Sequence, residues 1–65
     1  MKEKNELIAR NCFASLVLDY DFAGDDVFPP CVVCRVLIDG DFATYIHADT
    51  VQDAISDFYA GTWRD

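Results

Sequence analysis

The stretch that decides the fold is residues 31–47, which read CVVCRVLIDGDFATYIH. Its first eight residues are dense in β-branched side chains, which favour strands. Asp39 and Gly40 follow, and this dipeptide is the strongest short signal for a β-hairpin, because a type I′ turn needs a positive φ at both centres. The stretch therefore predicts a hairpin with strands over 31–38 and 42–47.

The register of this hairpin has two alternatives. A two-residue loop pairs Leu37 with Phe42. A three-residue loop over 39–41 gives a cleaner apolar face, which gathers Val32, Cys34, Val36, Ile38, Phe42, Thr44 and Ile46. The choice matters because a shift of one residue moves every side chain to the other face.

Residues 50–60 predict a helix after the hairpin. Asp49 or Thr50 is the expected N-cap, and Asp49 with Gln52 fits a capping box. Apolar residues then follow the i, i+3, i+4, i+7, i+8 stripe of an amphipathic helix. Gly61 fits the position just after the helix.

A second helix is predicted over residues 3–18, where Ile8, Cys12 and Leu16 recur at four-residue spacing. The alternative is a strand over 12–18, since that run is apolar throughout. Residues 19–30 predict a loop, because Gly24 and a Pro-Pro pair interrupt them. The expected architecture is a single α+β domain over 1–65, in the order α-β-β-α, with the hairpin packed against two helices.

The chain is short and apolar. It has 65 residues, of which 52% are hydrophobic, with nine aromatic side chains. Chains below about 70–80 residues often need a disulfide, a metal, a partner or a second copy for stability. A partner protein or a homodimer formed by pairing of strand edges is the expected outlet.

Charge is distributed very unevenly. The net charge is −7, and residues 11–63 hold nine aspartates against one basic residue, Arg35. Direct binding to nucleic acid or to an anionic membrane is therefore not expected, since Lys and Arg supply that affinity. The expected partner is a larger protein with a basic surface, and a nucleic-acid-binding protein is the most natural one. The simpler interpretation is that the charge only keeps the chain soluble.

The residues predicted to bind this partner are acidic or aromatic. Three aspartates recur every four residues and would form one row on a helix, two flank the hairpin turn, and Tyr and Trp are common interface anchors. The set is Asp39, Asp41, Asp49, Asp53, Asp57, Tyr59 and Trp63.

No motif predicts catalysis, and neither a metal nor a cofactor is expected. Cys31 and Cys34 form a C-x-x-C pair, but a strand sends positions three apart to opposite faces. Only Cys12 and His47 remain to complete a zinc site, and no second pair of ligands with the usual spacing exists. An EF-hand that begins at Asp19 fails because its twelfth position is Pro30.

The compartment is predicted from what the sequence lacks. No apolar segment follows the first residues as in a signal peptide, and no run approaches the 18 apolar residues of a membrane span. Three cysteines, an odd number, fit a reducing compartment. A cytoplasmic location is expected.

One segment carries a resemblance. The stretch YIHADTVQDAISDF, residues 45–58, resembles the strand-to-helix junction of many small α/β proteins, including some bacteriophage-encoded inhibitors of host enzymes. It covers about a fifth of the chain and carries no functional residue. Size and acidity are similar to those of phage anti-defence and host-takeover proteins, which is an analogy only.

These observations favour a non-catalytic protein-binding domain that inhibits or modulates a nucleic-acid-handling protein, with an Asp-rich surface that imitates nucleic acid. The first alternative is a structural or self-assembling subunit. The second is a small zinc protein that uses its cysteines and histidine.

Overall fold

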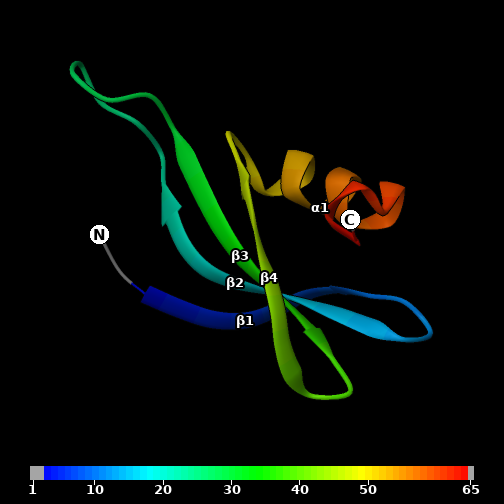
Figure 1. The fold of residues 1–65 in the computed structure, drawn as a ribbon. Helices are drawn as coiled ribbons and strands as arrows, with labels where there is room; N and C mark the ends of the chain where they lie inside the picture. The colour runs from blue at the N-terminus through cyan, green and yellow to red at the C-terminus, as the bar shows by residue number, and fades with distance from the viewer. Residues whose placement is uncertain (1–2, 65) are drawn as a thin grey trace.

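The computed structural model describes residues 3–64 and contains one sheet, one α-helix and a short 3-10 turn. The strands are β1 (Glu3–Arg10), β2 (Ala14–Phe22), β3 (Cys31–Ile38) and β4 (Asp41–Ala48). Each strand pairs antiparallel with the next, in the order β1-β2-β3-β4. Helix α1 (Val51–Ala60) and turn η1 (Thr62–Arg64) follow and lie together on one side of the twisted sheet (Figure 1).

The predicted α-β-β-α order is wrong, because residues 3–18 form β1 and the start of β2 rather than a helix. The alternative strand over 12–18 was nearer the truth. Between the strands, Asn11 Oδ1 accepts hydrogen bonds from the backbone N–H of Phe13 at 3.0 Å and of Ala14 at 2.8 Å. This side chain competes with helix formation by satisfying the backbone in a turn. The four-residue spacing therefore spans a hairpin and not one helix face.

Strand β2 shows the period of two that the helical interpretation overlooked. Ala14, Leu16 and Leu18 are buried, while the side chains between them are only half-buried. The strand continues to Phe22, so the predicted loop over 19–30 is wrong for its first four residues. A bulge between Leu18 and Tyr20 lets Asp19 be accommodated without breaking the ladder to β3.

The predicted hairpin is confirmed, and its register combines both alternatives. Asp39 and Gly40 have φ values of 54° and 84°, as a two-residue type I′ turn requires. Leu37 therefore pairs with Phe42, as the shorter loop predicts. A bulge then shifts the pairing, so that Cys34 faces Ile46 as in the longer-loop alternative.

The predicted second helix is also confirmed, as α1. Thr50 is the N-cap, and its hydroxyl oxygen accepts from the backbone N–H of Asp53 at 3.1 Å. Gly61 ends the helix with a φ of 79°, a left-handed conformation that glycine adopts without strain. Its N–H donates to the carbonyl oxygens of Asp57 and Phe58.

The core lies between α1 and one face of the sheet. Leu16, Cys34 and Val36 are fully buried there, and Phe58 of α1 packs into the same cluster. Trp63 closes it: the indole ring stacks on Phe58 at 5.9 Å, and its N–H donates to the Phe58 carbonyl at 2.8 Å. Within residues 3–64, no helix lies on the far side of the sheet.

Candidate interaction surfaces

The helical aspartates lie on the solvent side of α1. Asp53 and Asp57 are exposed, one turn apart, and about 6 Å separates successive positions at this spacing. Asp49 precedes the N-cap and therefore lies outside the helix, so the helical row has two members and not three. None of the three carboxylates has an ion-pair partner among residues 3–64.

The electrostatics of the helix favour one of these carboxylates and not the other. Asp53 lies in the first turn, near the positive end of the helix dipole. Asp57 lies in the last turn, where no basic residue of the helix offsets it. The negative charge of Asp57 interacts unfavourably with the helix dipole and with the charge of Asp53. It therefore lowers the stability of the helix.

The other two predicted aspartates lie elsewhere. Asp39 and Asp41 flank the tight turn between β3 and β4 and are exposed. Asp49 is at the opposite end of β4, and an 8-residue strand spans roughly 26 Å. The structure therefore places the acidic groups in two regions and does not gather them around one point.

The two aromatic members of the predicted set differ. Tyr59 is exposed, and its hydroxyl donates to the backbone carbonyl of Arg10 at 3.2 Å. It follows Asp57 by two residues, about 200° around the helix, so it points nearly away from the acidic side. Trp63 is half-buried on Phe58, and its N–H is already bonded.

The only basic residue between positions 11 and 63 is engaged on the far side of the sheet. The Arg35 guanidinium contacts the Asp19 carboxylate with Nη2 at 2.9 Å and Nε at 3.0 Å. This pair was not predicted. Because Arg35 lies on β3, it offers no neutralisation to the aspartates of α1, which is on the other side of the sheet.

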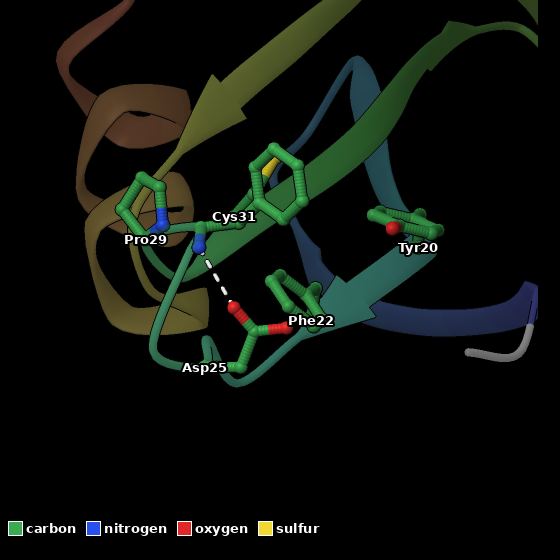
Figure 2. A pocket seen from close by; sticks show the side chains of 6 residues that line it. Tyr20, Phe22, Asp25, Pro29 and Cys31 are labelled. Carbon is green, nitrogen blue, oxygen red and sulfur yellow. Dashed lines mark hydrogen bonds between the residues drawn. The ribbon is translucent and has the colours of Figure 1, made fainter.

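A pocket of about 510 Å³ lies where the loop after β2 folds back. Figure 2 shows Tyr20 and Phe22 on the sheet side, with Asp25 and Pro29 on the loop. Its lining is aromatic and apolar apart from one carboxylate. Such a surface suits an apolar or aromatic side chain of a partner.

Asp25 organises that loop. Its Oδ1 accepts from the backbone N–H of Phe28 at 2.7 Å (Figure 2). It also accepts from the backbone N–H of Val27 at 2.8 Å. These two bonds, the one from Phe28 first, hold the pKa of the carboxyl below its usual value. Because both N–H groups donate to Oδ1, this oxygen stabilises the conformation of the loop.

The cysteines and the histidine do not converge. Cys34 points into the core, whereas Cys31 lies on the far face with Phe22 opposite it. Among residues 3–64 no group of three or more Cys, His, Asp or Glu side chains is placed to hold a metal. Burial, and then the charges of Asp19 and Asp21, raise the pKa of the Cys34 thiol to about 11, which makes it a poor nucleophile at neutral pH.

Sequence reasoning missed the far face of the sheet. In a sheet with one face toward water, outward side chains are usually polar. Here β2 and β3 place Val17, Val33 and Leu37 outward, opposite the buried set. The continuous apolar run over 31–38 could have indicated this face, because a strand with apolar side chains on both sides is usually buried on both sides.

Comparisons of the whole chain with protein-family models, with curated proteins and with solved structures find no match. No helix in the described part of the chain is long and apolar enough to cross a membrane. Function must therefore be argued from the surfaces themselves.

Proposed function

We propose that this chain is a non-catalytic protein-binding domain that inhibits or modulates a larger protein through its acidic surface. The observation that carries the proposal is the exposed, unpaired pair Asp53 and Asp57 on a rigid helix. The charge of Asp57 is unfavourable where it stands, so stability does not account for it.

A basic groove is the surface that such a helix fits. Carboxylates held on one side of a helix and at a hairpin tip present negative charge on fixed elements, as nucleic acid presents its phosphates. The natural target is therefore a protein or complex that handles nucleic acid, with the cytoplasm as its compartment. An anti-defence or host-takeover role is the biological setting that the small size and acidity support by analogy.

The experiment is capture from a lysate of the source cells with the tagged chain, at low and at high salt. We expect a nucleic-acid-binding protein to be retained at low salt and lost at high salt, because exposed charges are screened. The captured protein is then purified and tested for release of a bound double-stranded oligonucleotide when the chain is added.

Matched variants separate a charged docking surface from bulk charge. Asp53→Asn with Asp57→Asn removes two negative charges from α1. Asp26→Asn with Glu6→Gln removes two from other exposed positions. The proposal expects the first pair to weaken binding at least about tenfold and the second pair to change it about twofold or less. Equal losses, or binding insensitive to salt, would exclude docking through the helix.

The alternative of a self-assembling subunit has one specific observation in its favour, the uncovered apolar face of the sheet. It predicts that changes to outward residues such as Leu37 and Tyr45 abolish assembly, while changes to the aspartates do not.

A further inference from the structure

The side of the sheet opposite α1 is exposed, yet many of its side chains are apolar, as on a buried face. Cross-strand pairing places Leu7, Val17, Arg35 and Tyr45 in one row across all four strands. Ser15, Leu37 and Phe42 form the next row, and Tyr20, Val33 and His47 the row beyond Arg35. We call the apolar members of its central part the open face: Leu7, Val17, Val33, Leu37, Phe42 and Tyr45.

Much of this apolar surface is exposed in the isolated chain. Leu7 is 52% exposed, Phe42 54% and Tyr45 52%. The rings of Phe42 and Tyr45 contact each other at 4.9 Å, so they form one patch and not two isolated side chains. A continuous apolar patch of this kind marks an interaction site.

The whole side of the sheet that carries the open face is large enough for a stable interface. Four strands of 8 or 9 residues cover roughly 500 Å² in projection, from strand spacings of about 4.8 Å and rises of about 3.3 Å. Two such faces together bury about 1,000 Å² even before the relief of the side chains is counted, which is the lower limit of a specific interface.

Charge distribution selects what covers this face. Its centre holds Arg35 and Asp19, whose charges are paired with each other at 2.9 Å. The aspartates of α1 lie on the other side of the sheet. A basic partner would therefore be attracted to α1 and not to the open face. An apolar face whose central charges are paired is complementary to a second copy of itself.

We infer that the occupant is a second copy of this chain, packed face to face about a two-fold axis through the open face. Packed sheets lie about 10 Å apart, so each α1 is outermost and the two helices are about 30 Å apart. That distance exceeds the Debye length of about 8 Å at physiological salt, so the acidic helices do not oppose association. The inference concerns a different surface from the proposed function and does not rest on it.

The first test is the mass of the wild-type chain by sedimentation equilibrium, from low micromolar to a few hundred micromolar. We expect a transition from 7.3 kDa to twice that mass. A mass that stays at one chain over the whole range would overturn the inference, even if a different protein were found on this face.

Variants then locate the interface. Tyr45→Asp and Tyr45→Lys each place a charge on the β4 side of the open face, and the opposite signs separate burial of a charge from repulsion between acidic chains. We expect both to raise the dissociation constant at least about 100-fold, because a two-fold axis repeats each change. Val27→Asp is the control: Val27 is 78% exposed and lies in the loop before Pro29, away from the open face.

The outcomes are distinct. Monomeric Tyr45 variants with wild-type far-UV circular dichroism, beside a dimeric Val27→Asp, support the inference. A wild-type dimer whose affinity survives both Tyr45 changes would overturn it and point to pairing of strand edges. If a Tyr45 variant fails to fold, the mass of Phe42→Lys decides in the same way.

Discussion

Both faces of the sheet carry many apolar side chains, but their environments are opposite. On the inner face, Leu16 and Val36 are fully buried under α1. On the open face, Leu7 and Tyr45 are each 52% exposed. The difference arises because residues 3–64 contain one amphipathic helix, whose single apolar stripe can cover only one side of four strands.

This contrast shows that the apolar content of a strand predicts how many sides need cover, and not what covers them. The inner face obtains its cover from the same chain. For the open face the cover has to come from outside, and the aspartates are segregated away from it.

The largest effect is expected for the same substitution made on opposite faces. Phe58 is 1% exposed and Phe42 is 54% exposed. Phe58→Ala should lower the free energy of unfolding by about 3–5 kcal/mol, because it removes the ring on which the core and Trp63 pack. Urea unfolding followed by far-UV circular dichroism measures this change.

Phe42→Ala is the matched control. At low micromolar concentration, where we expect the chain to be monomeric, it should cost less than about 1 kcal/mol, since surface changes are usually small. Equal losses for the two variants would break the contrast, because the two rings would then be equally buried.

Trp63 lies at the edge of the inner core. Trp63→Ala should cost about 2 kcal/mol, since the half-buried indole stacks on Phe58 and bonds to its carbonyl. Thermal unfolding measures it. An unchanged midpoint would show that the last turn of the chain does not close the core, and would leave Trp63 free to act as the partner anchor predicted from sequence.

Cys34 reports the inner face through its thiol. Because its pKa is raised from 9.0 to about 11, the native state keeps a proton that the unfolded state loses. Its contribution to stability is therefore complete below pH 9 and falls as pH rises toward 11, with about 1 kcal/mol lost by pH 10.

The measurement compares the wild type with Cys34→Val between pH 8 and 10 by urea unfolding, so that other groups cancel. Reaction with a thiol reagent at pH 8 gives a second readout: exposed Cys12 should react quickly and buried Cys34 only on unfolding. Rapid reaction of all three cysteines in the native state would contradict the buried position of Cys34.

The smallest effect is expected on the helix. Asp57→Asn should raise the free energy of unfolding by about 0.5 kcal/mol, because it removes a charge opposed by the helix dipole and by Asp53. The same change should weaken partner binding. Asp53→Asn is the control, since Asp53 lies in the favourable first turn and its loss should not stabilise. A destabilised Asp57→Asn would remove the argument that this charge is kept for function.

The C-terminal half of the fold was predictable because its signals are local. The Asp39-Gly40 turn, the strand over 31–38, the Thr50 cap and Gly61 each satisfy backbone groups close in sequence. The final register was not predictable, since the bulge between Val36 and Leu37 reconciles a short turn with the face that α1 must cover. That choice depends on packing against residues far along the chain.

The predictions for residues 3–22 were wrong because a helical and a strand period coincide there. Ile8, Cys12 and Leu16 fit a helix at four-residue spacing, yet Cys12 lies in a turn. The turn residue Asn11 and the alternation of Ala14, Leu16 and Leu18 were the better signals. Phe13, which follows Cys12 in that turn, is 41% exposed.

For the candidate surfaces, the exposed aspartates were predictable from the sequence, but the way they are grouped in space was not. Asp53 and Asp57 are on one side of α1, while Asp39 and Asp41 are at a separate turn. The open face and the pocket beside Phe22 are made by pairing of strands, so their residues become neighbours only once register and bulges are known.

The most direct test of the contrast between the two faces is an isotope-filtered NOE experiment on a mixture of labelled and unlabelled chains at a few hundred micromolar. Contacts between chains should involve Val17, Val33, Leu37 and Tyr45, with none from Ala54 or Phe58. The absence of any contact between chains, or contacts confined to α1 or to the strand edges, would contradict the account that the open face is an interface.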